Sequence, residues 1–396
     1  MRNINHKYRA AQEGRRLITA LAIAGLQLLS TVWPSGSLRA GEEEHQNAFN
    51  WKNLQSDIAG VADRTDPNLV NSWGLVINPT AKIFWVADNG AGVSTLYRPD
   101  GTPVVLGNGR NFVTLPPTMV DTPTSPATTA ASAPTGIVFN GTAGAFLIPR
   151  TASPAVFMWD GEDGGIWGWN PGVNLLTATL IIQPSSPDST TNSVYKGLAL
   201  ANRKSDGPTL YATNFRNGTI DVFDSSFHMV TTFSDPSPPA PGYAPFGIAN
   251  IDNLLYVTFA LQNGEKHDDV SGPGNGFVDV FSPDTGFIER LIPLTTNGPL
   301  NSPWGLARVP HEFGKFGHDV LLVGNFGNGW INAFNIHTGT FIASLLHRPG
   351  QPLAFNGLWA LFFFDGKLYF TAGIGDESHG LFGVIKPARG EEESHD

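Results

Sequence analysis

One short unit recurs along the chain and restricts the folds open to it. The stretch from Trp304 to Asn335 contains an apolar segment that begins with Trp-Gly-Leu, a second apolar segment, an Asn-Gly pair and a third apolar segment. The stretch 194–224 repeats the same order. Strand-like segments joined by Asn-Gly predict a small antiparallel sheet, because this pair supplies the positive φ angles of a tight hairpin turn.

Six copies of the unit align on a glycine that precedes an apolar run. These glycines are 50 to 62 residues apart and are Gly74, Gly136, Gly197, Gly247, Gly305 and Gly357. Repeated antiparallel sheets of this length are typical of β-propellers. The 45 Gly and 30 Pro also disfavour long helices. The sequence therefore predicts an all-β fold, a six-bladed β-propeller of four-stranded antiparallel blades.

The last blade lacks a strand that the N-terminal part can supply. Fourth strands are expected at 112–115, 179–182, 230–233, 288–292 and 341–345, but the sixth repeat ends before providing one. Phe49–Leu54 has a partial strand pattern and stands alone ahead of the first repeat. We predict that 49–54 pairs in the last blade and closes the ring, because an open ring would leave two unpaired sheet edges.

The propeller is then a single domain over 49–387, joined by polar connections. Segments rich in Pro, Ser and Thr are expected to be exposed loops between blades, at 116–134, 183–193 and 234–245. Residues 41–48 are expected to be a flexible acidic N-terminus, and 388–396 a disordered tail.

The first forty residues differ from the rest. Basic residues come first, then an uncharged run at 17–33, and then the small residue Ala40. The basic residues are Arg2, Lys7, Arg9, Arg15 and Arg16. This order predicts a signal peptide over 1–40 and an exported protein, periplasmic or extracellular in a bacterium. A membrane anchor is the alternative, since the run is near the lower length for a span.

Charge and cysteine content exclude several functions. The formal net charge is −10, and loss of 1–40 would make it about −15. A chain with this much negative charge is not expected to bind nucleic acid, because binding to phosphates depends on Lys and Arg. No membrane span is expected in the mature chain. The chain has no cysteine, which excludes thiol nucleophiles, zinc–thiolate sites and iron–sulfur clusters.

Asn and Asp recur where strands would approach the propeller axis. The residues at the ends of second strands or just before first strands are Asn71, Asp88, Asp160, Asn214, Asn301, Asn325 and Asn356. Converging oxygens would suit Ca²⁺, which takes 6–8 oxygen ligands. Calcium is thus a possible cofactor, although none is established. Alternatively, these residues stabilise turns by bonding to nearby backbone groups.

Two charged loops interrupt the repeat, one in blade four and one in blade six. Their ionisable residues are Lys266, His267, Asp268, Asp269, Asp376, Glu377 and His379. Meeting on one face, they could bind a ligand or transition metal, or perform acid–base chemistry. Alternatively, they form solvated loops around a glycine-rich turn. Trp73 and Trp304 share one repeat position and are expected to pack between neighbouring blades.

Several segments carry a family resemblance. They are SDIAGVADRTDPNLVNSWGL (56–75), ADNGAGVSTLY (87–97), KHDDVSGPGNGFVDVF (266–281), NSPWGLA (301–307) and GDESHGLFG (375–383). Together they resemble a family of uncharacterised exported bacterial propellers with an Asn-Pro-Trp-Gly-Leu signature, often with a C-terminal protein-sorting tail. This chain has Ser72 in place of the usual Pro and ends in ARGEEESHD, without a hydrophobic tail. The resemblance implies the fold and export but no activity.

More distantly, the repeat is similar to six-bladed propellers of the gluconolactonase, paraoxonase and NHL types. No G-x-S-x-G, H-E-x-x-H, phosphate-loop or EF-hand motif is present. We therefore expect a non-enzymatic scaffold that binds an unknown protein or small molecule on its loop-rich axial face. The alternatives are a Ca²⁺- or other metal-dependent hydrolase of the lactonase or esterase type and a structural envelope component.

Overall fold

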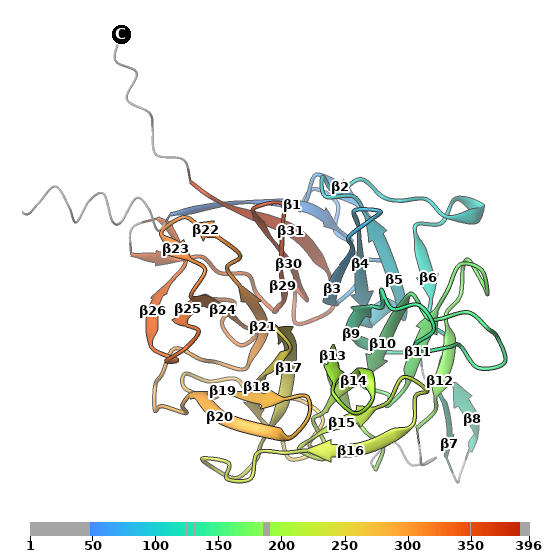
Figure 1. Ribbon diagram of the computed structural model, residues 1–396. Coiled ribbons are helices and arrows are strands. Elements are labelled where there is room, and N and C mark those ends of the chain that lie inside the picture. Colours follow the sequence, from blue (N-terminus) through green and yellow to red (C-terminus); the bar gives the residue numbers. More distant parts are fainter. Residues whose placement is uncertain (1–47, 123–124, 130, 185–190, 349, 389–396) are drawn as a thin grey trace, which may run out of the picture.

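The computed structural model describes residues 48–388 except 123–124, 130, 185–190 and 349. The predicted signal peptide and nearly all of the two terminal segments lie outside the described residues. Six sheets surround one axis, with β3, β9, β13, β17, β21 and β29 innermost (Figure 1). This confirms the six-bladed β-propeller.

In blades one to five the strands follow the sequence outward from the axis, and in blade six the outermost strand is the N-terminal one. Blade one contains β3 (Ser72–Asn78), β4 (Ile83–Asp88), β5 (Val93–Tyr97) and β6 (Phe112–Thr114); blade two contains β9 (Pro134–Phe139), β10 (Phe157–Gly161), β11 (Ile166–Trp169) and β12 (Thr179–Ile182); blade three contains β13 (Tyr195–Arg203), β14 (Gly207–Asn214), β15 (Thr219–Phe223) and β16 (Met229–Phe233). Blade four contains β17 (Tyr243–Ile251), β18 (Leu254–Leu261), β19 (Phe277–Ser282) and β20 (Gly286–Ile292); blade five contains β21 (Pro303–Arg308), β24 (Val320–Asn325), β25 (Ile331–Asn335) and β26 (Phe341–Ser344); blade six contains β29 (Leu358–Phe364), β30 (Lys367–Ala372), β31 (Leu381–Pro387) and β1 (Phe49–Ser56).

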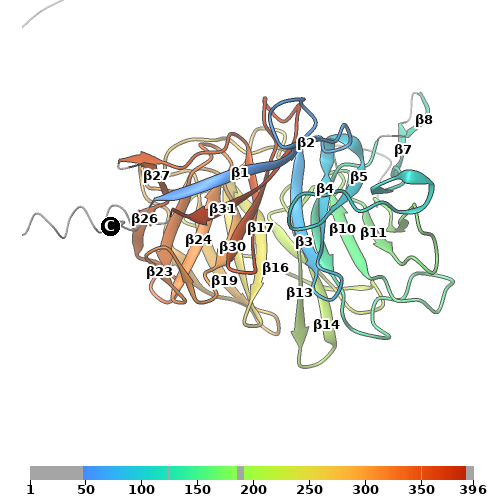
Figure 2. The ribbon, with the colours of Figure 1, turned by 90° about the horizontal axis from the view of Figure 1, so that it is seen from above.

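Strand β1 closes the ring, as predicted. It pairs antiparallel with β31, from Phe49 opposite Pro387 to Ser56 opposite Leu381, and lies beside it in Figure 2. Phe49 is fully buried, and its ring stacks 4.9 Å from Phe313. The start of the described chain is therefore anchored to blade six by backbone pairing and to blade five by an aromatic contact.

The centre of the propeller is filled by aromatic side chains. The residues before the repeat glycines are Trp73, Thr135, Lys196, Phe246 and Trp304, and Trp359 takes this place in blade six. The ring centroid of Trp73 lies 3.4 Å from that of Trp359, 6.1 Å from that of Trp304 and 6.5 Å from that of Phe246. Trp73 of blade one thus contacts residues of blades four and five, which are not its neighbours, and such contacts are possible only at the axis. We call these four residues the aromatic plug.

The plug corrects two predictions. Trp73 and Trp304 pack across the axis, not between neighbouring sheets. The sixth repeat also begins later than predicted, because Leu361 lies opposite Phe370 as Leu306 lies opposite Val323. Ala360, not Gly357, therefore occupies the repeat-glycine position.

A close approach between blades explains the repeat glycine. A Cβ atom on Gly247 would lie 2.1 Å from the carbonyl oxygen of Trp304, and one on Gly74 would lie 2.5 Å from that of Thr135. Neighbouring inner strands therefore approach too closely for a side chain at this position.

The turns and loops differ in detail from the prediction. Positive φ angles occur at three of the four predicted turn glycines, Gly164, Gly218 and Gly329, but not at Gly276. The residue before each of these glycines has a negative φ angle. The turns are therefore not the two-residue type in which both central angles are positive. Residues 119–129 contain a hairpin, β7 (Met119–Thr122) with β8 (Ser125–Thr129), where a plain loop was expected.

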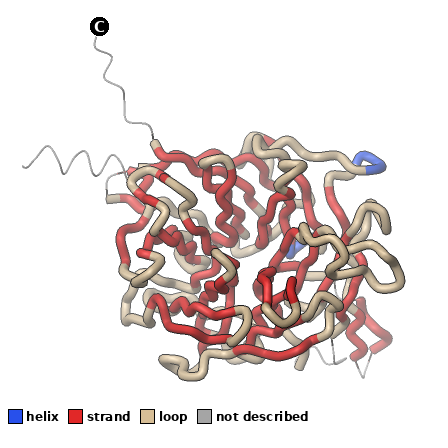
Figure 3. Tube along the Cα trace, in the orientation of Figure 1, coloured by secondary structure: helices blue, strands red, loops and turns tan. Residues whose placement is uncertain are grey.

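Small elements decorate the blades. They are β2 (Arg64–Thr65), β22 (Glu312–Phe313), β23 (Phe316–Gly317), β27 (Leu346–Arg348), β28 (Gln351–Pro352) and the 3₁₀ turns η1 (Asn89–Ala91) and η2 (Gly107–Gly109). Figure 3 shows strands and loops almost throughout. Within the described ranges, no helix is long and apolar enough to cross a membrane.

Phe49→Ala tests the closure. Loss of a fully buried Phe should lower the free energy of unfolding by about 3–5 kcal/mol. Asn50→Ala, an exposed neighbour on the same strand, should change it by less than about 0.5 kcal/mol. Urea unfolding measures both, and equal effects of the two variants would contradict the anchoring role of Phe49.

Candidate functional site

All six blades contribute polar groups to one end of the axis. This is the end where inner strands begin and second strands finish, and we call it the upper end. The group comprises Asn71, Asn89, Glu162, Lys196, His267, Asp268, Asp269, Ser302 and Glu377, and we call it the axial polar cluster.

Lys196 is the buried cation at the base of the cluster. Its side chain is 2% exposed, and its ammonium group lies 5.2 Å from the ring centroid of Trp73. The ammonium pairs with Glu162 and lies 3.6 Å from a carboxylate oxygen of Asp268. Burial alone would lower the Lys196 pKa, but attraction to Glu162, Asp268 and Asp269 outweighs it and raises that pKa.

The plug also fixes the height of this lysine along the axis. The indole Nε1 of Trp304 donates a hydrogen bond of 2.7 Å to the Lys196 carbonyl oxygen. Phe215 and Phe246 complete the apolar surroundings of the ammonium, with centroids 5.8 and 6.0 Å away. The Lys196 backbone is therefore held by blade five, and its ammonium group lies against rings of blades three and four.

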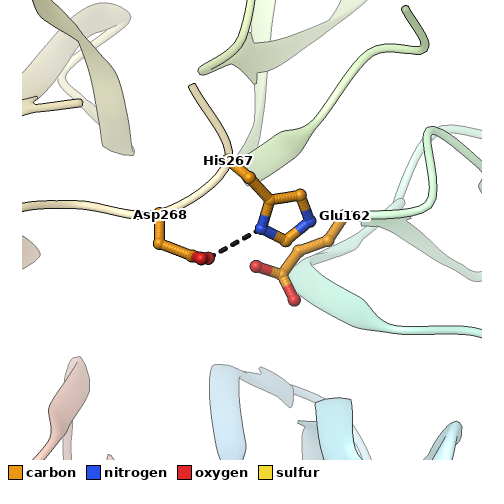
Figure 4. A group of neighbouring side chains, drawn as sticks. All are labelled: Glu162, His267 and Asp268. Atoms are coloured by element: carbon orange, nitrogen blue, oxygen red, sulfur yellow. Dashed lines mark hydrogen bonds and ion pairs between the residues drawn. The ribbon is translucent and has the colours of Figure 1, made fainter. Parts of the chain in front are cut away.

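Three potential metal ligands meet above Lys196. Glu162 follows β10, while His267 and Asp268 come from the loop after β18, and one ligand atom of each lies within 4.8 Å of the others (Figure 4). The His267 Nδ1 lies 2.7 Å from Oδ1 of Asp268. This contact, with Lys196 as a further cause, lowers the pKa of Asp268 to about 2. Asp268 is therefore ionised at neutral pH.

A relay of amides joins the charged loop of blade six to the turn after β10 in blade two. Nδ2 of Asn89 donates to Glu162 over 2.8 Å, and Nδ2 of Asn71 donates to Glu377 over 2.9 Å. Asn71 Nδ2 also lies 3.3 Å from Asn89 Oδ1, and Trp359 Nε1 donates to Asn71 Oδ1 over 3.3 Å. Glu377 of blade six is thereby connected through blade one to Glu162 of blade two.

Two further carboxylates are protonated more easily than usual. Burial raises the pKa of Asp269, although hydrogen bonds from Ser302 and Ser271 oppose the shift. Burial also raises the pKa of Glu377, and repulsion from Glu162 adds to the effect. Both carboxylates would be stabilised in their ionised form by a cation arriving at the upper end.

The backbone around the cluster adopts an uncommon conformation. Asn71 and Ser302 hold equivalent places in blades one and five and have φ of 47° and 46°. In blade six the equivalent residue is Gly357, with φ of 65°, and Glu377 has φ of 62°. Such angles in non-glycine residues are uncommon and concentrate at functional sites.

The cluster has an excess of negative charge. Glu162, Asp268, Asp269 and Glu377 supply four carboxylates against the single ammonium of Lys196. Attraction between charges strengthens in partly buried sites, where the effective dielectric constant is lower than in water. The chemistry of the cluster therefore favours a cationic guest.

Most predicted axial oxygens are bonded within or beside their own blades. Asp88 accepts hydrogen bonds from Ser72 and Thr95, and Asp160 accepts from Thr135 and the Gly136 N–H. Asn214, Asn301 and Asn325 bond to nearby backbone or side chains. Asn356 is exposed, and only Asn71 joins the axial polar cluster. These bonds are of the turn-stabilising kind, and calcium binding stays a prediction.

The predicted loop residues divide into two groups. His267, Asp268, Asp269 and Glu377 belong to the axial polar cluster, so the two loops do share one end of the axis. Lys266 and Asp376 are exposed. His379 instead pairs with Asp57, with 2.6 Å between Nδ1 and Oδ2.

Sequence reasoning missed the two residues at the centre of the cluster. Lys196 occupies a place that Trp73, Phe246 and Trp304 fill in other repeats, so a charged residue in an aromatic column was the available signal. Glu162 lies in the turn after β10 beside Asp163, where it resembled an ordinary turn residue.

Comparison with known proteins places the chain among uncharacterised relatives. No protein-family model matches it. Uncharacterized protein R648 of Acanthamoeba polyphaga mimivirus is 31% identical over 344 residues, which cover 84% of this chain and 78% of the relative. The chain belongs to the family of protein R648. Uncharacterized protein L690 of the same virus is also similar, at 32% identity over 337 residues and 82% of each chain.

Solved structures resemble the chain at low sequence identity. A Bacteroides thetaiotaomicron protein of unknown function is 12% identical, with a TM-score of 0.51 over 86% of this chain and 76% of that one. Streptogramin B lyase is 14% identical, with a TM-score of 0.45 over 87% of this chain and 99% of that one. At these identities the likeness extends to the fold alone. The bacterial origin and signature implied by the resemblance remain predictions, since the family members named above are viral.

Asp160→Asn tests whether this carboxyl is structural. Burial raises the Asp160 pKa to about 7, so its contribution to stability is complete below about pH 4 and is lost as pH rises through about 7. Asparagine keeps the oxygen that accepts from Thr135 and Gly136 but does not ionise. The variant should gain stability over the wild type between pH 5 and 8, by up to about 4 kcal/mol.

Thermal melting across this pH range measures the difference, and Asp319→Asn, an exposed carboxylate, serves as the control. A variant less stable than the wild type at pH 8 would contradict the structural role. That result would favour a bound cation at Asp160.

Proposed function

We propose that the protein is an exported binding propeller that receives a small cationic ligand, such as an organic amine, at the axial polar cluster. The carrying observation is the convergence of four carboxylates from blades two, four and six around one buried lysine. Export is supported by the basic and apolar order of residues 1–40.

The site has the properties of a preformed receptor. Glu162 is positioned by Asn89 and Lys196, and Glu377 by Asn71, so their carboxylates are held before a ligand arrives. Groups that are already ordered lose little conformational entropy on binding. Lys196 offsets part of the mutual repulsion of the carboxylates while leaving the site negative.

Spermidine binding tests this function. Asp268→Asn and Glu377→Gln should each weaken the affinity roughly tenfold, equivalent to about 1.4 kcal/mol, because each removes one attractive charge. Asp319→Asn removes a carboxylate of similar exposure outside the cluster and should have no such effect. Titration calorimetry at low and high salt measures the affinities, and salt should weaken binding.

Lys196→Met tests whether the ligand is positively charged. Methionine suits the apolar surroundings of this side chain and removes the resident cation, so spermidine should bind more tightly. Weaker binding by this variant, absence of spermidine binding, or an equal loss in Asp319→Asn would each refute a cationic ligand at this cluster.

A metal-dependent hydrolase of the lactonase or esterase type is the second candidate. It is favoured by the mutual approach of Glu162, His267 and Asp268, a mixed nitrogen and oxygen set that suits a transition metal. A metal bound there would lower the pKa of a coordinated water and supply a nucleophile. Calcium, which prefers oxygen ligands, fits this group less well because of the histidine.

Zinc titration followed by thermal melting separates the two candidates. For the hydrolase, Zn²⁺ should raise Tm, a chelator should reverse the rise, and His267→Ala should abolish it. His318→Ala, which removes an exposed histidine elsewhere, should retain the response. A Tm indifferent to Zn²⁺ and chelator would contradict the hydrolase and leave the amine receptor.

A further inference from the structure

A hollow opens at the end of the axis opposite the axial polar cluster. It has a volume of about 640 Å³, and its walls come from the inner strands of all six blades. The inner strands run from the aromatic plug toward this hollow, so the plug separates it from the axial polar cluster. The two sites therefore cannot share one small ligand.

The walls of this lower hollow are apolar. The repeat glycine or alanine is followed in every blade by Leu or Ile, and each of these residues lines the hollow. The next position also lines it and is occupied by Val76, Val138, Ala199, Ala249, Ala307 and Phe362. The three alanines are on blades three, four and five.

Arg308 of blade five contributes a charged group to the lining of the hollow. Arg308 ends β21, pairs with Asp252, and donates from Nε to the His318 carbonyl oxygen over 3.0 Å. Among the described residues, none accepts a hydrogen bond from its Nη2. Since Nη2 carries N–H donors and charge-assisted hydrogen bonds to carboxylates are strong, Arg308 retains capacity for an anionic head group.

We propose that the lower hollow binds an amphipathic monocarboxylate, a molecule with an apolar body and a single carboxylate that Arg308 recognises. The volume falls within the range of about 300–1,000 Å³ that is usual for small-molecule pockets. Mostly apolar walls with a few polar groups, here Asn250, Asp252 and Arg308, are the composition such pockets show. The inference does not depend on the cationic ligand proposed for the upper end.

Decanoate binding to the full-length protein tests the proposal. Octanoate should bind about fifteenfold more weakly, because it lacks two CH₂ groups and each buried CH₂ contributes about a fourfold change in affinity. Ala249→Phe, which replaces a small residue in the wall of the hollow by a large one, should remove decanoate binding. Arg308→Gln should weaken decanoate about tenfold and leave decanol unchanged, since an alcohol has no charge to lose.

Asp268→Asn is the matched control, because it alters the upper end and should leave decanoate binding intact. Titration calorimetry gives the affinities, and far-UV circular dichroism verifies that each variant is folded. The Arg308→Gln result decides the proposal if Ala249→Phe fails to fold. Absence of decanoate binding, equal affinity for octanoate, or full affinity in folded Ala249→Phe or in Arg308→Gln would overturn it.

Discussion

Packing of aromatic rings across the axis is the interaction on which this propeller depends. Six sheets arranged in a circle leave a gap at the centre, and protein interiors tolerate few empty spaces. Here Trp73, Phe246, Trp304 and Trp359 fill the gap with contacts that cross from blade to blade. The repeat glycines bring the inner strands close enough for these rings to meet.

The plug also creates the chemistry above it. A lysine in the ring of axial positions could not remain charged in an aromatic environment without partners. Glu162 and Asp268 provide them from two other blades, and Asp269 adds to the attraction. The buried cation thus organises acidic side chains that would otherwise repel one another at the upper end.

The fold was predictable because its signals are local and repeated. Alternating apolar segments, turn glycines and a missing sixth outer strand predict six blades and closure by 49–54, and β1 confirms this. Convergence of the two charged loops on one end of the axis also followed from the repeat. The pairing of Lys196 with Glu162 did not, since the two lie 34 residues apart on different blades and no local pattern joins them.

Other errors arose where the repeat varies. Gly357 was aligned with the repeat glycines because it is a glycine that precedes an apolar run. The strand pairing in blade six instead places Ala360 at the repeat-glycine position. Trp73 and Trp304 were correctly recognised as equivalent, but periodicity does not say whether a side chain faces a neighbouring sheet or the axis. An Asn or Asp residue at the end of a strand can either stabilise a turn or coordinate a metal. The sequence is the same in both cases, and only the hydrogen bonds of the side chain distinguish the two roles.

The pairing of β1 with β31 has a consequence for biosynthesis. Phe49 and Pro387 lie at opposite ends of the described chain yet face each other in one sheet. Blades one to five contain their own strands and can form in order as the ribosome elongates the polypeptide. Blade six must wait until translation has delivered its last strand, and until then Phe49 and the face of blade one that packs on blade six are exposed to solvent or to chaperones.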